Sequence, residues 1–127
     1  MKGKILLIMM KMGKMMNTDE LNLKDNPNLN DFQEYVKKMK ILRDFKTNDK
    51  FYECCLLAEE VGELISAVRK NSKTGSIGSG SVVGNVKCEL ADVFLYLCSI
   101  ANMHGIDLEE AVREKEEINK QRIWNRL

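Results

Sequence analysis

The stretch Leu57-Ala58-Glu59-Glu60-Val61-Gly62-Glu63-Leu64 decides how the rest of this chain is interpreted. It sets acidic residues among apolar ones at helical spacing. Residues three and four apart share one face of an α-helix, so Glu60 and Glu63 point the same way, with Glu59 beside them. The stretch therefore predicts a helix that carries carboxylates next to apolar, packed surface.

A second acidic stretch, Cys88-Glu89-Leu90-Ala91-Asp92-Val93, follows on the next predicted helix, where Glu89 and Asp92 share a face. Carboxylates that converge in a helical core repel one another unless a cation neutralises them. Oxygen ligands without histidine or thiolate suit Mg²⁺ or Mn²⁺, and magnesium is commonly shared with substrate phosphates. The two stretches together predict a di- or triphosphate ligand and metal-assisted hydrolysis.

Composition favours one all-α domain. The 127 residues are enough for a single core, and the body of the chain is nearly free of proline. Lys plus Arg (20) balances Asp plus Glu (19), so charge gives no case for a nucleic-acid or membrane partner. The apolar run Ile5 to Met10 is too short for a membrane span or a convincing signal peptide. A cytoplasmic location is expected by default.

Apolar spacing predicts four helices. Asn30 is the expected N-cap of the first helix, and Asn48 and Asp49 are the candidate caps of the second. Gly105 is the expected stop of the third helix, and Asp107 the N-cap of the fourth. Residues 1–28 are expected to form a poorly ordered extension, 29–127 the helical domain, and 71–85 a flexible loop. The predicted helices run over about 31–45, from the polar break at 46–50 to about 70, over about 86–103, and from 108 to about 124.

Two features of these helices bear on assembly and on the surface. The second helix is apolar around more than half of its circumference, because Leu56, Leu64 and Ala67 widen its main stripe. Such a helix is packed on two sides, so a second subunit is expected to cover it. On the first helix, the basic residues fall mostly off the apolar stripe: Lys37, Lys38, Lys40 and Arg43. Such a basic face could attract phosphates, but a solvated helix surface is the expectation.

Other metal sites are disfavoured. The four cysteines form no C-x-x-C pair, so a zinc knuckle is not indicated and they are interpreted as small apolar residues of a reducing compartment. A di-iron bundle wants Glu-x-x-His motifs, whereas Ala101 stands three residues before the single histidine, His104. His104 is interpreted as a surface or cap residue.

The acidic motifs and a donor stripe on the last helix also resemble a known family. Glu59-Glu60-x-x-Glu63, then Glu89-x-x-Asp92, then Lys115-x-x-x-Asn119-x-x-Arg122 resemble the signature of the MazG-like nucleoside triphosphate pyrophosphohydrolases, which include the dCTP pyrophosphatases. The resemblance covers roughly residues 30 to 124. It implies a four-helix bundle completed by assembly as a homodimer or homotetramer, and hydrolysis of a (deoxy)nucleoside triphosphate to the monophosphate and pyrophosphate in nucleotide-pool house-cleaning.

The resemblance also implies roles for particular residues. Glu60, Glu63, Glu89 and Asp92 would hold Mg²⁺, for which Mn²⁺ could substitute. Glu59 and Glu60 would be catalytic, with Glu59 an outer ligand or the group that orients the water. Lys115, Asn119 and Arg122 would meet the phosphates or sugar, and Tyr96 the nucleoside.

Base preference stays open at this point. The Trp and His that dCTP-selective members carry before the second helix are absent, and only Phe45 and Phe51 stand nearby. Alternatives are a phosphoribosyl-ATP or dUTP hydrolase of the same group, or a non-catalytic helical dimerisation module whose acids are simply solvated.

Overall fold

A computed structural model describes residues 21–45, 48–72 and 77–125, and every regular element in these ranges is a helix. The all-α prediction is therefore confirmed. Most of the predicted N-terminal extension lies outside the described residues; residues 21–28 are not helical, and Leu21 packs against the core. The helices are α2 (Leu29–Leu42), α3 (Lys50–Asn71), α4 (Val86–Met103) and α5 (Leu108–Lys120).

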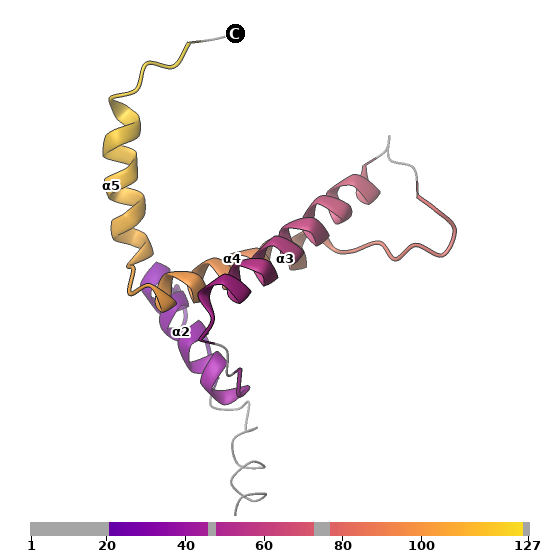
Figure 1. Cartoon of the computed structure of the whole chain (residues 1–127), viewed down its shortest axis with the longest axis horizontal. Coiled ribbons are helices and arrows are strands. Elements are labelled where there is room, and N and C mark those ends of the chain that lie inside the picture. The colour runs from indigo at the N-terminus through magenta and orange to yellow at the C-terminus, as the bar shows by residue number, and fades with distance from the viewer. Residues whose placement is uncertain (1–20, 46–47, 73–76, 126–127) are drawn as a thin grey trace, which may run out of the picture.

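The long helices α3 and α4 lie side by side as an antiparallel hairpin, joined by the 72–85 connection (Figure 1). Helix α2 packs across the end of the hairpin where α3 begins and α4 ends (Figure 1). Helix α5 leaves from this same end and extends away from the hairpin, packing against α2. The junction of α2, α3 and α4 is thus the part of the molecule where three elements meet.

Local capping signals explain where the helices begin and end. Asp49 and Asp107 are the N-caps of α3 and α5, as predicted. Gly105, with φ 64°, follows the last turn of α4 and ends that helix, also as predicted. The predicted cap of the first helix was wrong. The N-cap is Asn28, whose side chain accepts from the Asp31 N–H at 2.9 Å while Asp31 accepts from the Asn28 N–H at 2.8 Å. Asp31 here replaces the Glu or Gln of the usual capping box, so the motif was missed.

The core is small and lies at the three-helix junction. Val36 and Met39 of α2 pack with Cys98 of α4, and the rings of Phe32 and Phe94 meet edge to face at 5.2 Å. Cys98 is fully buried, and burial raises the pKa of its thiol. The other three cysteines are exposed, and all four are free thiols.

A buried amide fixes the start of α5. Gln33 is 7% exposed, and its Nε2 donates to Asn102 Oδ1 at 3.1 Å and to the Ile106 carbonyl at 2.8 Å. Its Oε1 accepts the Leu108 N–H at 2.9 Å. Gln33 therefore ties α2 to α4, to the α4–α5 connection and to the start of α5.

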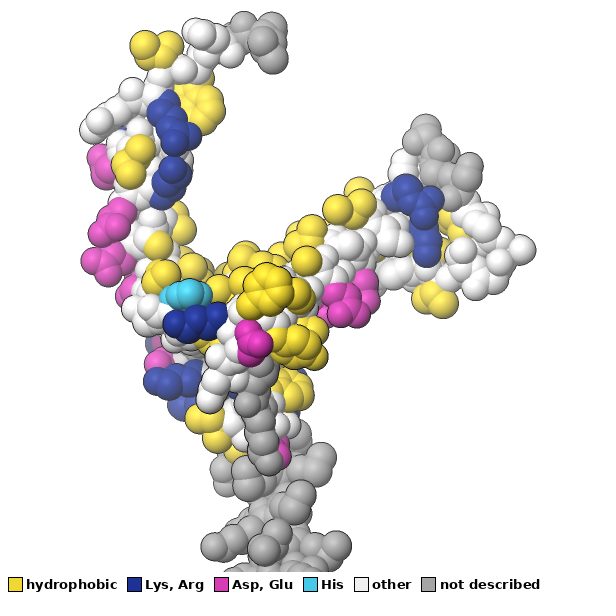
Figure 2. Space-filling view, viewed as in Figure 1, with side chains coloured by type: hydrophobic (Ala, Val, Ile, Leu, Met, Phe, Trp, Pro, Cys, Tyr) yellow, Lys and Arg dark blue, Asp and Glu magenta, His cyan; other side chains and the backbone are white. Residues whose placement is uncertain are grey.

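Large apolar side chains remain exposed along the hairpin. Figure 2 shows hydrophobic side chains gathered along the arm that α3 and α4 form. The exposed large apolar side chains of these two helices include Val61, Ile65, Val68, Leu90 and Leu97. The described helices include none that is both long and apolar enough to cross a membrane.

Candidate active site

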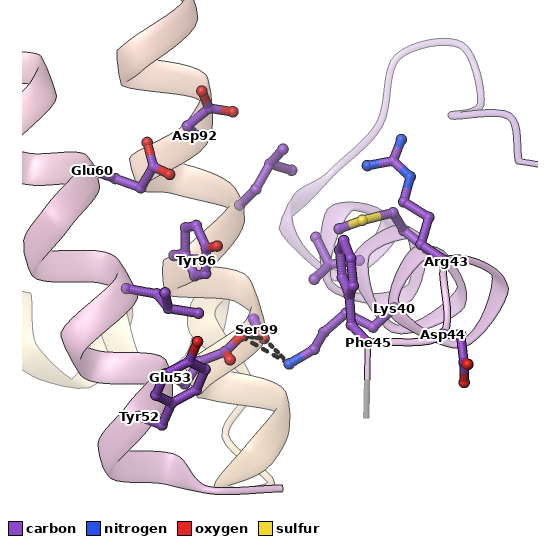
Figure 3. A pocket seen from close by; sticks show the side chains of 14 residues that line it. Lys40, Arg43, Asp44, Phe45, Tyr52, Glu53, Glu60, Asp92, Tyr96 and Ser99 are labelled. Atoms are coloured by element: carbon purple, nitrogen blue, oxygen red, sulfur yellow. Dashed lines mark hydrogen bonds and ion pairs between the residues drawn. The ribbon is translucent and has the colours of Figure 1, made fainter. Parts of the chain in front are cut away.

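The acidic residues of α3 and α4 face one another across the hairpin. Because the two helices run antiparallel, Glu63 lies opposite Glu89, and Glu60 lies opposite Asp92 one turn further along. One carboxylate oxygen from each of Glu60, Glu63 and Glu89 lies within 4.8 Å of the other two. Asp92 adjoins this group and lines the same cavity as Glu60 (Figure 3). The four residues predicted to bind metal are thus close neighbours.

The electrostatics of the cluster favour a cation. Loss of solvent raises the pKa of Glu60, and the negative charges of Asp92, Glu63 and Glu89 raise it further. The pKa of Glu89 is raised by the same loss of solvent, then by the charges of Glu63 and Asp92 and by a hydrogen bond with the Glu63 carboxyl. Oxygens held this close resist simultaneous ionisation, and a divalent cation removes that penalty. The donor set therefore fits Mg²⁺ or Mn²⁺.

Two further predicted site residues lie beside the cluster. Glu59 is exposed, and its charge contributes to the raised pKa of Glu60. Tyr96 lies one turn below Asp92 and lines the cavity (Figure 3). Loss of solvent raises the pKa of Tyr96, and the charge of Glu60 is the next cause, so its phenol remains a neutral donor at ordinary pH.

A cavity of about 560 Å³ extends from the acidic cluster into the junction of α2, α3 and α4. Its walls are mostly apolar or aromatic, with Leu56 and Leu95 on the hairpin and Phe45 after α2. Arg43, the C-cap of α2, also lines it, across from Glu60 and Asp92 (Figure 3). Cavities of this volume with a few polar groups are typical of sites for small organic ligands.

The end of the cavity away from the acids holds a buried ion pair. Lys40 Nζ lies 2.8 Å from Glu53 Oε1, and the Lys40 side chain is only 17% exposed. The expectation that Lys40 is solvated was therefore wrong. Its charge partner stands thirteen residues away, at the start of another helix, and the placement of α2 across the end of the α3–α4 hairpin brings the two together.

The donor stripe predicted on the last helix lies apart from this cavity, and Arg122 follows the end of α5, which stops at Lys120 and not near residue 124 as predicted. Lys115 and Arg122 are exposed, and the Asn119 amide donates to Glu116 Oε1 at 2.8 Å within α5. None of the three residues lines the cavity of its own chain, because α5 extends away from the hairpin (Figure 1).

Four residues that line the cavity were not predicted as site residues: Lys40, Arg43, Glu53 and Ser99. A signal for two of them was present. Glu53 stands seven residues before Glu60, and Ser99 seven residues after Asp92, so each continues a polar line by two helical turns. For Lys40 and Arg43 no such periodicity exists, because their relevance comes from the crossing of α2 over the hairpin.

Comparison with known proteins identifies the class. The MazG nucleotide pyrophosphohydrolase domain matches residues 54–123, and the chain belongs to this family. Two crystal structures of iMazG from Vibrio DAT 722 share 34% identity and a TM-score of 0.55 with it. The alignments cover 74% and 79% of this chain and 99% and 100% of those chains. The predicted family is thus confirmed.

Two phage proteins are similar to parts of this chain. A dATP/dGTP diphosphohydrolase of Cyanophage S-2L is 34% identical over 70 residues, which are 55% of this chain and 53% of that protein. A dATP/dGTP diphosphohydrolase of Salmonella phage PMBT28 is 49% identical over 39 residues, 31% of this chain and 13% of that protein. This chain therefore matches only about half of the first relative and a small part of the second.

Proposed function

We propose that this chain hydrolyses a purine deoxynucleoside triphosphate to the monophosphate and pyrophosphate, with Mg²⁺ as cofactor. The observation that carries the proposal is the convergence of Glu60, Glu63 and Glu89 at one end of a nucleotide-sized cavity. Membership of the MazG family supports the reaction. The names of the two phage relatives support purine deoxynucleotides over the dCTP and dUTP alternatives.

The proposed mechanism assigns the metal to Glu60, Glu63, Glu89 and Asp92. A bound Mg²⁺ supplies Lewis-acid polarisation of a phosphoryl oxygen and lowers the pKa of a bound water. Glu59, exposed beside the cluster, orients the attacking water and accepts its proton, with Glu60 as the other catalytic carboxylate. The water oxygen bonds to phosphorus, the α–β anhydride bond breaks, and pyrophosphate leaves.

The phosphates also need cations from the protein. Arg43 lines the cavity within the same chain. We propose that Lys115, Asn119 and Arg122 reach the phosphates in a homodimer or homotetramer, where α5 of one copy approaches the hairpin of another. The exposed apolar side chains along α3 and α4 support such an assembly, since burying them is favourable.

A nucleotide screen with paired variants tests the function. The wild type is expected to release pyrophosphate from a purine dNTP with Mg²⁺, in a panel that includes all common NTPs and dNTPs and phosphoribosyl-ATP. Glu63→Gln is expected to lose at least about 100-fold in kcat, as removal of a catalytic electrostatic group typically does, with its circular dichroism unchanged. Glu114→Gln, an exposed acid on α5, is the control and should keep full activity.

Two results would contradict the proposal. Full activity in Glu63→Gln would remove the acidic cluster from the mechanism. Absence of pyrophosphate release from every nucleotide would favour the non-catalytic dimerisation module.

A further inference from the structure

The buried cluster at the end of the cavity away from the acids contains more hydrogen-bonding capacity than it uses internally. Glu53 is 2% exposed, and its Oε1 accepts from both Lys40 Nζ, at 2.8 Å, and the Ser99 hydroxyl. Lys40 Nζ also lies 2.8 Å from Ser99 Oγ. The three side chains come from three different helices and meet at one carboxylate oxygen (Figure 3).

The second oxygen of Glu53 is available to a ligand. Among the described residues, the donors that reach the Glu53 carboxylate both bond to Oε1. Every fully buried side-chain oxygen or nitrogen in the described part of the chain has a hydrogen-bond partner. Glu53 lines the cavity, and its bonds to Lys40 and Ser99 both use Oε1, which leaves Oε2 as the oxygen for a ligand. The Lys40 ammonium has three N–H donors and directs two of them at Glu53 and Ser99. The cavity thus ends in an acceptor beside a spare donor.

The spacing between the two ends suits a nucleoside. Glu53 and Glu60 are seven residues apart on α3, and Ser99 and Asp92 are seven apart on α4. Seven residues are two turns, a rise of about 10 Å. A nucleotide whose phosphates lie at the acidic cluster would therefore place its base near Glu53.

The walls between the ends suit a base. Tyr52 lies beside Glu53, and Phe45 lines the opposite wall (Figure 3). Leu56 lies between the levels of Glu53 and Glu60 on α3. Aromatic and apolar side chains bind the faces of a base by stacking and leave its edge to polar groups. The Lys40–Glu53 ion pair lies where the polar edge of such a base would be.

We propose that Glu53 and Lys40 form the base-reading pair of this site, a proposal that rests on the function proposed above. Glu53 Oε2 accepts an N–H of the purine edge, and Lys40 donates to the acceptor next to it. Adenine offers its 6-amino group beside N1, and guanine offers its N1–H beside O6. A pyrimidine has one ring fewer and ends further from the pair. Ser99 is a positioning residue that holds Oε1 and so aims Oε2 into the cavity.

A matched pair of substrates tests this assignment without any mutation. The triphosphate of purine deoxyriboside differs from dATP only in lacking the 6-amino group. Loss of a hydrogen bond to a charged acceptor is expected to lower kcat/KM for the analogue about 10- to 100-fold. Equal kcat/KM values, with pyrophosphate released from both, would overturn the base-reading pair and leave the proposed hydrolysis standing.

The variant Glu53→Gln then locates the effect. Its amide oxygen keeps the bonds to Lys40 and Ser99, while an NH₂ donor replaces Oε2. The difference between the two substrates is expected to shrink to within about threefold, because dATP loses its partner and the analogue does not. Glu34→Gln, on the exposed face of α2, is the control and should retain the wild-type difference.

A purely structural ion pair gives a different result. In that case Glu53→Gln lowers the melting temperature and reduces kcat/KM for both substrates by the same factor, which would overturn the proposal. If Glu53→Gln does not fold, Ser99→Ala is the second variant, and it too is expected to narrow the difference. If Ser99→Ala folds and keeps the wild-type ratio of kcat/KM between dATP and the analogue, the base-reading pair is overturned. Failure of the wild type to hydrolyse any nucleotide would instead overturn the proposed function itself.

Discussion

Glu60 and Glu89 illustrate at the residue scale how a binding site works against the stability of its own protein. Their raised pKa values mean that the folded state holds protons more tightly than the unfolded chain, whose glutamates titrate near 4.5. The stability that these groups contribute is fully present below that pH. It is lost as the pH rises through the folded-state pKa. At neutral pH the metal-free cluster is therefore destabilising.

This linkage predicts a pH-dependent effect of Glu60→Gln. Without Mg²⁺, the variant and the wild type should melt at the same temperature below about pH 4.5. The variant should become progressively more stable than the wild type as the pH rises to 7.5, because it lacks one of the repelling charges. Thermal melts across this range, with and without Mg²⁺, measure the difference. Mg²⁺ should raise the melting temperature of the wild type at pH 7.5 and do little for the variant. A difference in melting temperature between the variant and the wild type that stays the same at every pH would contradict this linkage.

At the scale of the element, Gln33 determines where α5 begins relative to the other helices. Gln33→Leu removes three side-chain hydrogen bonds, so the Leu108 N–H, Asn102 Oδ1 and the Ile106 carbonyl lose this partner. Buried groups left unsatisfied cost about 2–4 kcal/mol in total, measurable as a lower urea midpoint. Glu34→Ala, at the adjacent exposed position, should change stability by about 0.5 kcal/mol or less. Equal midpoints for the two variants would show that the Gln33 network is not a stabilising contact.

Most of each helix could be predicted from the sequence because its signals are local. Asp49, Gly105 and Asp107 act within one turn of their own positions, and the acid spacings depend only on helical geometry. What escaped prediction depends on how helices cross. The burial of Gln33 and Lys40 and the lining role of Arg43 follow from the placement of α2 across the hairpin, for which no short-range pattern exists. The same reason explains why α5 could be predicted as a helix but not as one that points away from the acids.

On the scale of the whole molecule, the exposed apolar surface of the hairpin predicts self-association. Ile65 of α3 is 61% exposed although it is a large aliphatic side chain. Ile65→Glu is expected to shift the protein from dimer or tetramer toward monomer in size-exclusion chromatography with light scattering, because a charge cannot be buried in an apolar interface without a partner. Ile41→Glu on α2, where the side chain is 63% exposed, is the matched control and should leave the molar mass unchanged. A monomeric wild type would contradict the proposed assembly.

Because Cys98 is the one buried cysteine, the reactivity of its thiol reports how often the core opens. Cys98 lies among Val36 and Met39, whereas Cys54, Cys55 and Cys88 face solvent. A thiol reagent should label three cysteines at once and the fourth only when α2 lifts off the hairpin, so its labelling rate measures that event. Nucleotide bound beneath α2 should slow the fourth reaction without affecting the first three. Occupancy of the cavity could then be followed by mass spectrometry of the intact chain, independently of turnover.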